Sequence, residues 1–383
     1  MIQAAPVIET PEFSGTSSFY ETLRPLCLSG LGQALNARTS IYDRQLRDKT
    51  WQATLGTEDL TSTAICLIGI DRAGIDPGSI GLNVDQTLGA LIDLAGRHQY
   101  HGGLGLVVWA NAVCEGPPLE DLLDRSGTPL NDLPAFIAPL TTMETAWLTS
   151  GLIHEWKRTG AETTRQLAVQ ATALLHERQH AQTDLMVHAT ASAPANHRVR
   201  KGIANFADQI YSVQAFAFAA NAFGDEQSLD AAEACAARLV EFQGRLGQWW
   251  WHYNAPAGHV AQRYPVYAVH QHGMAPMALS ALAAAGGTDH TAAADLSRAW
   301  LTHNELDVNL IDSQAETIWR DIEPDEGRFR TLARRLQSVA GWKPSESEPP
   351  RFKINFETRP YEWAWCLYAG AIAHGTPNPR HIV

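Results

Sequence analysis

The stretches "SLDAAEACAARLVEFQGRLG" (Ser228–Gly247) and "YPVYAVHQHGMAPMALSALAAAGG" (Tyr264–Gly287) follow one another in the chain but differ in kind. The first repeats apolar residues at helical spacing and keeps its charges on the opposite face, which is typical of a surface helix. The second is apolar nearly all round and rich in Ala and Gly, which is typical of a buried helix. Together they predict an outer helix followed by an inner helix.

The same contrast recurs along the chain, and the alternating β-branched residues that mark strands are nearly absent. We therefore predict an all-α protein. An alternation of outer and inner helices over about six hairpins is expected of an (α/α)6 toroid, in which an outer ring wraps an inner ring. The absence of a repeat of fixed length argues against a regular solenoid. The predicted helices lie near 18–36, 59–74, 84–97, 102–115, 138–158, 162–178, 203–222, 227–246, 265–286, 291–304, 326–340 and 359–374.

Composition limits the class of protein. The 383 residues, 45% of them hydrophobic, fit one large domain spanning 1–383. A net charge of −12 argues against a nucleic-acid partner, which requires concentrated Lys and Arg. No apolar stretch approaches the roughly 20 residues of a membrane helix, and no secretory leader is visible, so we expect a cytoplasmic protein. The five cysteines are scattered singly, which favours buried thiols over disulfides or a zinc knuckle.

A short motif at the end of one outer segment gives a more specific indication of the fold. "QGRLGQW" (Gln243–Trp249) fits the pattern Gln-x-x-x-Gly-x-Trp, and "QLRDKTW" (Gln45–Trp51) is a weaker copy with Lys49 in place of the glycine. Here the chain resembles the α/α toroids of the terpenoid-cyclase and prenyltransferase superfamily, whose repeats close with such corners. The resemblance implies the toroid. No Asp-x-Asp-Asp acid motif accompanies it, and toroids also host glycoside hydrolases, lyases and epimerases, so the reaction stays open.

Candidate catalytic residues follow from the polar groups on the apolar inner segments, whose ends face the cavity of a toroid. Asp208 opens the seventh segment. Tyr264, Tyr267 and His270 are spaced by three in the ninth segment, so helical geometry predicts that they share one face. Imidazole changes its protonation near neutral pH, which predicts acid–base chemistry at His270. The alternative is that each histidine is a core residue bonded to a neighbouring carbonyl.

Further candidates lie in "QAETIWRDIEPDEG" (Gln314–Gly327), where Glu316 is a possible acid or base; the alternative is a connection held by salt bridges. Aromatic, imidazole and charged groups near the inner segments are predicted to bind substrate. The predicted binding residues are Trp250, Trp251, His252, Tyr253, Arg263, His272, Arg320, Arg359, Tyr361 and Glu362. The polar stretch 342–360 is predicted to be a lid or a crossover loop.

The pattern of histidines does not favour a metal, because His270 and His272 are two apart and point about 200° apart on a helix. There is no phosphate-binding glycine loop and no nucleophile elbow, so we expect no cofactor. We predict a carbohydrate-active enzyme, an epimerase, lyase or hydrolase, acting on a small-molecule or oligosaccharide substrate such as a uronate-containing chain. The alternatives are a terpenoid cyclase or isomerase, and a non-catalytic toroid that binds protein partners.

Overall fold

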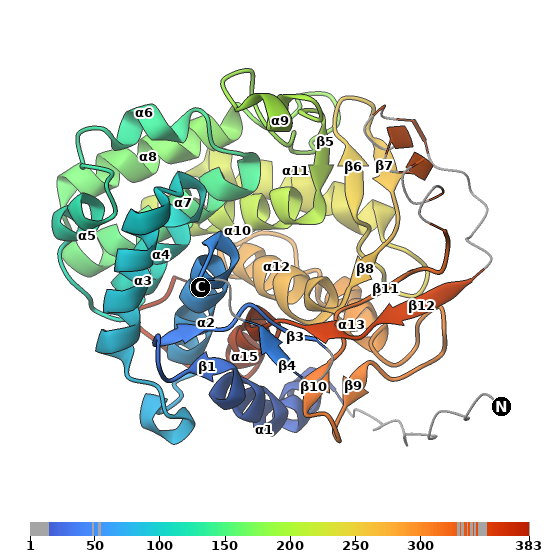
Figure 1. The fold of residues 1–383 in the computed structure, drawn as a ribbon. Helices are drawn as coiled ribbons and strands as arrows, with labels where there is room; N and C mark the ends of the chain where they lie inside the picture. The colour runs from blue at the N-terminus through green and yellow to red at the C-terminus, as the bar shows by residue number, and fades with distance from the viewer. Residues whose placement is uncertain are drawn as a thin grey trace.

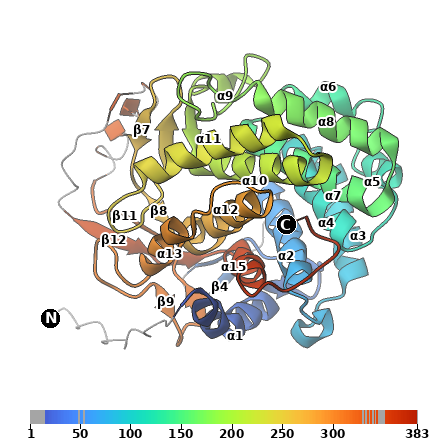
Figure 2. The same ribbon diagram turned by 180° about the vertical axis from the view of Figure 1, so that it is seen from behind.

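The computed structural model describes residues 15–382, except 48–49, 53–54, 328–329, 331–332, 335, 338–339, 341 and 344–350. Within this part of the chain, two layers of helices form the molecule (Figures 1 and 2). The inner layer is a closed ring, because each inner helix packs against the next and the last packs against the first. In ring order these helices are α2 (Thr57–Arg72), α4 (His101–Val113), α7 (Thr142–Thr159), α10 (Phe206–Phe223), α12 (Ala275–Ala284) and α15 (Pro360–Ala373).

The outer helices pack against the ring with one apolar face each. Helix α8 lies on α7, α11 on α10, α13 on α12 and α1 on α15. In contrast, almost every residue of the inner helices α4 and α10 is buried, because neighbours cover them on several sides. The outer helices are α1 (Thr16–Ala34), α3 (Val84–His98), α8 (Glu162–His176), α11 (Glu226–Phe242) and α13 (Thr291–Ala299). The predicted all-α toroid is confirmed.

Short helical pieces fill the connections between the longer helices. They are a 3-10 turn (Pro77–Ile80), α5 (Leu119–Arg125), α6 (Leu133–Ile137) and α9 (Ala195–Arg198). No helix among the described residues is both long enough and apolar enough to cross a membrane.

Short strands, which the sequence pattern did not predict, lead into four inner helices. Strand β4 (Thr50–Gln52) precedes α2, β5 (Ile203–Asn205) precedes α10, β8 (Val266–Tyr267) precedes the turn before α12, and β13 (Glu357–Thr358) precedes α15. These strands have two or three residues each, too few to produce a period in the sequence. Because they lie at the N-terminal ends of inner helices, they build one end of the ring.

The strands pair into small antiparallel sheets. In the described part of the chain, three of these have three strands, in the orders β12-β11-β8, β13-β3-β4 and β5-β6-β7, and two are two-stranded. Both views place β7, β11 and β12 on the opposite side of the molecule from α5 and α6 (Figures 1 and 2). The remaining strands are β1 (Leu35–Asn36), β2 (Ile41–Tyr42), β3 (Gln45–Arg47), β6 (His252–Asn254), β7 (His259–Gln262), β9 (Ile311–Asp312), β10 (Thr317–Ile318), β11 (Asp321–Pro324) and β12 (Phe352–Asn355).

The two predicted corners have different outcomes. Gln243 ends α11, and its Nε2 donates to the carbonyls of Gly247 and Ala293, at 3.1 and 2.9 Å. Gly247 has φ of 98°, which suits glycine. Trp249 is buried against Phe206, and Trp250 is the ring that contacts the turn, at Phe242 and Gly244. The interpretation of Gln45–Trp51 as a second corner is wrong. Helix α1 already ends at Ala34, and this stretch pairs as the hairpin β3–β4.

The ninth predicted segment, 265–286, is helical only from Ala268. A π-helical turn, His270–Met274, leads into α12, and Pro276 lies in the first turn of that helix. Tyr264 and Pro265 are joined by a cis peptide bond, and Tyr267 belongs to β8. The helical face predicted for Tyr264, Tyr267 and His270 is therefore wrong, although strand β8 still carries Tyr267 to the ring of His270.

The C-terminal connection is described only in part. Within the predicted helix 326–340, residues 330, 333–334 and 336–337 are helical, and residues 328–329, 331–332, 335 and 338–339 lie outside the described residues. In the stretch predicted as a lid or crossover, 342–360, residues 344–350 are likewise outside. Its described part is paired: β12 lies against β11, and β13 lies against β3. These residues form part of the framework of the site.

Candidate active site

A cavity lies where the strands meet the first turns of the inner helices. It has two adjoining lobes that share Trp251 and Tyr267. The inner lobe, about 390 Å³, is lined by residues from the starts of α2, α7, α10 and α15, among them Glu58, Met143, Asn205 and Tyr361. The outer lobe, about 420 Å³, is lined by strand and loop residues, among them Arg200, His252, Tyr264, Asp321 and Asn355.

Seven of the predicted site residues line this cavity, although they come from distant parts of the chain. They are Trp251, His252, Tyr264, Tyr267, His270, Arg320 and Tyr361. Folding brings them together because β8 pairs with β11, so that Val266 and Tyr267 lie opposite Ile322 and Asp321. Stretches more than fifty residues apart thus supply adjacent parts of one wall.

His270 is enclosed by rings on the wall of the inner lobe. Its ring centroid lies 4.7 Å from that of Phe206, 5.1 Å from that of Tyr267 and 6.1 Å from that of Trp251. Burial, followed by the positive charge of Arg320, lowers the pKa of His270 to about 3. Its Nδ1 is buried without a hydrogen-bond partner among the described residues. The imidazole is therefore neutral, and its Nδ1 makes no hydrogen bond to the described residues.

Arg320 belongs to a string of alternating charges along the base of the cavity. Arg44 contacts Glu58, Glu58 lies 3.1 Å from Arg359 Nη1, and Arg359 Nε lies 2.6 Å from Glu357. Glu357 in turn contacts Arg320, whose Nε lies 3.5 Å from Asp321 Oδ2. The guanidinium of Arg320 also lies over the ring of Tyr267, 5.2 Å from its centroid. The string contains three arginines and three carboxyl groups.

Asp321 is the carboxyl group of this string that lines the outer lobe. It lies opposite Tyr267 on one neighbouring strand and opposite Asn355 on the other, and it is 2% exposed. Its Oδ2 accepts a hydrogen bond from Asn355 Nδ2 at 3.0 Å, and its Oδ1 is buried without a partner among the described residues. Burial raises the pKa of Asp321 to about 7, although Arg320 opposes the shift. The carboxyl group therefore holds a proton near neutral pH.

His252 and Arg200 face the outer lobe as a pair. His252 Nδ1 lies 3.0 Å from Gln262 Oε1, which can only accept, so the proton is on Nδ1. Nε2 is then the acceptor for Arg200 Nη1, at 3.4 Å. Burial, followed by the charge of Arg200, lowers the pKa of His252 to about 4. His252 is thus a neutral support that orients a cationic side chain toward the cavity.

Asp208 does not line either lobe, contrary to its predicted place. It is fully buried at the start of α10, where Oδ2 accepts from the Asn205 backbone at 2.9 Å and from His188 Nδ1 at 2.9 Å. Its Oδ1 accepts from the backbone of Met143 at 3.0 Å. The carboxylate therefore ties together the first turns of α7 and α10, and Met143 and Asn205 are the residues that reach the inner lobe.

His272 and Glu362 lie behind the cavity wall, inside the core. His272 Nε2 is 2.8 Å from Glu362 Oε1, and both side chains are fully buried. Burial by itself would lower the pKa of His272, but its interactions with Cys366 and Glu362 raise it to about 9. His272 thus holds a proton near neutral pH, whereas burial raises the pKa of Glu362 and His272 opposes that shift. The predicted contact of the two residues with substrate is not supported by their position.

The other predicted site residues lie outside both lobes. Trp250 donates from Nε1 to the Phe242 carbonyl at 2.7 Å, and Arg263 lies over its ring. Tyr253 is fully buried. Arg359 pairs with Glu58 and Glu357 in the charge string.

Glu316 lies in the turn between β9 and β10, on the surface. Its Oε2 accepts hydrogen bonds from Ser29 and Gln33 of α1, at 2.8 Å each. The salt-bridged connection that we considered for this stretch is thus closer to the structure than an active-site carboxylate. Asp321, five residues later, is the carboxyl group that reaches the cavity.

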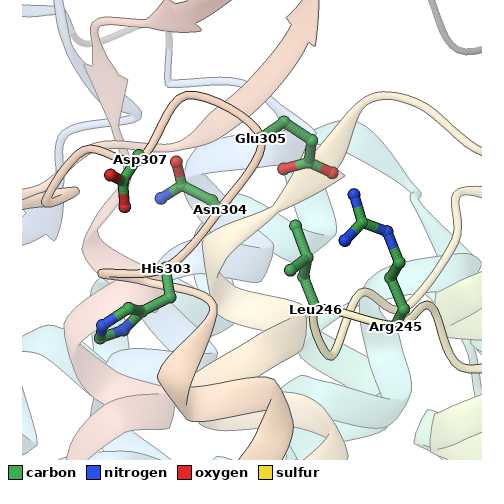
Figure 3. A pocket seen from close by; sticks show the side chains of 6 residues that line it. All are labelled: Arg245, Leu246, His303, Asn304, Glu305 and Asp307. Carbon is green, nitrogen blue, oxygen red and sulfur yellow. The ribbon is translucent and has the colours of Figure 1, made fainter.

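A separate polar pocket of about 370 Å³ lies at the corner after α11 (Figure 3). Arg245 extends toward Glu305, while His303 and Asp307 lie on the other side (Figure 3). Glu305 is already engaged, since it accepts from Gln248 Nε2 and from Trp300 Nε1, each at 2.9 Å. These bonds hold the loop after α13 against the corner. Among the described residues, no group of three or more His, Cys, Asp or Glu is arranged to hold a metal ion.

Solved structures of sugar-cleaving enzymes are similar to this architecture over almost their whole length. An unsaturated glucuronyl hydrolase specific for heparin aligns with 96% of this chain and 99% of its own, at a TM-score of 0.60 and 12% identity. The unsaturated glucuronyl hydrolase from Bacillus sp. GL1, responsible for glycosaminoglycan degradation, aligns with 95% of this chain and 99% of its own, at a TM-score of 0.60 and 11% identity. A glycosidase variant in complex with glucose aligns with 94% of this chain and 98% of its own, at a TM-score of 0.55 and 14% identity.

The chain shares their α/α toroid fold. No protein-family model and no curated protein matches the sequence. At 11–14% identity the likeness establishes the fold alone. The toroid implied by the corner motif is therefore confirmed, and the three solved structures named above are sugar hydrolases. The chemistry must be argued from the residues of the cavity.

Proposed function

We propose that this protein is an enzyme that acts on acidic oligosaccharides, cleaving a glycosidic bond beside a uronate. Three features of the cavity support this. Trp251, Tyr267 and Tyr361 offer aromatic faces on which sugar rings can stack. Arg200 and Arg320 offer guanidinium groups suited to a carboxylate. The similar solved structures include hydrolases of unsaturated glucuronyl sugars, which is consistent with this choice.

The charge string favours an anionic substrate. With every group ionised, the three arginines and three carboxylates balance. Because the pKa of Asp321 is raised to about 7, this carboxyl group becomes largely neutral as the pH falls below 7. The string then carries an excess positive charge beside the cavity, in a protein whose net charge is −12. A negatively charged sugar would thus be attracted to the site and not to the rest of the surface.

The observation that carries the proposed reaction is the buried carboxyl group of Asp321, whose Oδ1 has no partner among the described residues and whose pKa burial raises to about 7. A general acid must hold its proton at the working pH and present it to the leaving oxygen, and a buried carboxyl group does both. We assign Asp321 as the acid that protonates the glycosidic oxygen. His270, neutral and with a free Nδ1, is assigned to accept a hydrogen bond or proton from water or a sugar hydroxyl. Tyr264 and Tyr267 are assigned to position the ring.

The test is a panel of substrates with the products identified by mass spectrometry. The panel contains disaccharides with unsaturated uronate ends, saturated uronides, and neutral glycosides of the same linkage. Hydrolysis adds one water across the bond, elimination creates a double bond, and epimerisation leaves the mass unchanged. Turnover of acidic sugars with uptake of water is expected. Turnover of neutral glycosides alone would contradict the proposed role of the arginines, and an unchanged mass with a new stereoisomer would favour an epimerase.

The Asp321→Asn variant should lose turnover by roughly 10² to 10⁴, the usual contribution of a general acid. Asp325→Asn is the matched control, because Asp325 is exposed and lies just beyond the same strand. In the wild type, turnover should fall as pH rises through about 7, since the acid must be protonated. Asp208→Asn tests the earlier candidate. Loss of turnover in Asp208→Asn with normal activity in Asp321→Asn would show that Asp208, and not Asp321, is the general acid.

A further inference from the structure

The N-terminal and C-terminal helices of the described chain close the ring together. Helices α1 and α15 lie side by side in both views (Figures 1 and 2). Gly30 of α1 lies under the Trp363 ring, where a Cβ atom would approach ring atoms to within 2.4–2.6 Å. At the other end of the contact, Gly370 of α15 lies against the Tyr20 side chain. The two helices are therefore antiparallel and closely packed.

Cys27 and Cys366 face one another between these two contacts. In an antiparallel pair, residues one turn inward from Gly30 and from Gly370 meet, and these are Cys27 on α1 and Cys366 on α15. The two side chains lie close enough for each to shift the pKa of the other, and both are buried. The other three cysteines, Cys66, Cys114 and Cys235, have no such thiol partner among the described residues.

Cys366 also differs from the other cysteines in its surroundings. It lines a surface pocket of about 290 Å³ between α1 and α15, together with Arg24 and His374. On its inner side it interacts with His272, which is charged through its pairing with Glu362. Burial alone would raise the pKa of Cys366, but Cys27 and His272 lower it to about 6. Burial raises the pKa of Cys66, Cys114 and Cys235.

We propose that Cys27 and Cys366 form an oxidisable thiol pair that a small peroxide converts to a disulfide joining α1 to α15. The Cys366 thiolate attacks one oxygen of hydrogen peroxide, the O–O bond breaks, and a water leaves after protonation, which gives a sulfenic acid. The Cys27 sulfur then attacks the oxidised sulfur, and the S–O bond breaks. A second water leaves and the S–S bond forms, so the pair gives up two electrons and two protons while the peroxide is reduced. This inference is independent of the proposed function.

Two short stretches of chain connect the surroundings of the thiol pair to the cavity. His272 lies two residues from His270, and Glu362 follows Tyr361, and both His270 and Tyr361 line the inner lobe. Oxidation removes the thiolate with which His272 interacts. The disulfide would also fasten the first outer helix to the last inner helix, where the ring closes.

The test uses the folded full-length protein with a few equivalents of hydrogen peroxide, followed by alkylation of the remaining thiols and peptide mapping. The wild type should give a peptide linked through Cys27 and Cys366, lighter by two hydrogen atoms and restored by dithiothreitol. In Cys27→Ala, Cys366 should be trapped as a sulfenic acid by dimedone. In Cys366→Ala, oxidation of Cys27 should slow at least about tenfold, because the reactive thiolate is missing.

Cys235→Ala is the matched control, since this buried thiol contacts Gln209 on another part of the ring, and it should behave as the wild type. Circular dichroism before and after treatment verifies that each protein is folded. The proposal is overturned if the folded wild type keeps both thiols reduced while other cysteines react. It is also overturned if the linked peptide forms only after denaturation.

Discussion

His270 and His272 are two residues apart on one π-helical turn, yet they lie in opposite electrostatic environments. His270 faces the cavity, where burial and Arg320 lower its pKa to about 3. His272 faces the core, where Glu362 and Cys366 overcome the effect of burial and raise its pKa to about 9. Burial is similar at the two positions, so the nearest charge decides the sign of the shift. One side of the turn offers a neutral ligand group, and the other holds a buried ion pair.

The largest expected effect is a loss of activity on the cavity side of the turn, where His270 lies. His270→Gln should lower turnover of an acidic oligosaccharide by roughly 10² to 10⁴, because the free ring nitrogen is lost from the cavity. The effect should appear in kcat more than in KM if the group acts in the transition state. The measurement is steady-state kinetics on the substrate found in the panel. Wild-type turnover in His270→Gln would show that His270 only packs between Phe206 and Trp251 and takes no part in the reaction.

The next effect is a difference in the free energy of unfolding between a variant at His272 and one at His270. His272→Gln leaves Glu362 buried without its cationic partner, and breaking a buried pair in this way costs about 3–5 kcal/mol. His270→Gln breaks no ion pair and loses ring contacts with Phe206 and Tyr267, which are worth about 0.5–1.5 kcal/mol each. Urea unfolding of the two variants and the wild type measures both values. Equal losses would show that the His272–Glu362 pair contributes no more than packing.

The smallest effect is a difference in pH dependence. His272 has a raised pKa in the folded state, so its contribution is fully present below about 6.5 and is lost as pH rises through about 9. His270 has a lowered pKa, so its contribution is present above about 6.5 and is lost as pH falls toward about 3. The free energy of unfolding relative to each Gln variant should therefore change with opposite signs. Parallel pH profiles would contradict the two assigned environments.

The same dependence on neighbours explains why the carboxyl groups were assigned less well than the helices. Glu316 and Asp321 are five residues apart in one acidic stretch, and the local sequence gives no reason to prefer either. The turn between β9 and β10 sends Glu316 to Ser29 and Gln33 on α1. The pairing of β11 with β8 and β12 places Asp321 between Tyr267 and Asn355. Only these long-range pairings identify the carboxyl group that reaches the cavity.

The sequence by itself determined the features that depend on local patterns. Apolar residues recur at helical spacing over nine to nineteen residues, long enough to distinguish buried inner helices from amphipathic outer ones, and Gln243 and Gly247 formed the predicted corner. Tertiary structure decided the strands of two to four residues, the π-helical turn at His270, and the sides to which neighbouring polar groups point. Strands this short have no period of their own, and they exist because a distant segment supplies their hydrogen bonds. A pKa likewise depends on charges brought close by folding, such as Arg320 for His270 and Glu362 for His272.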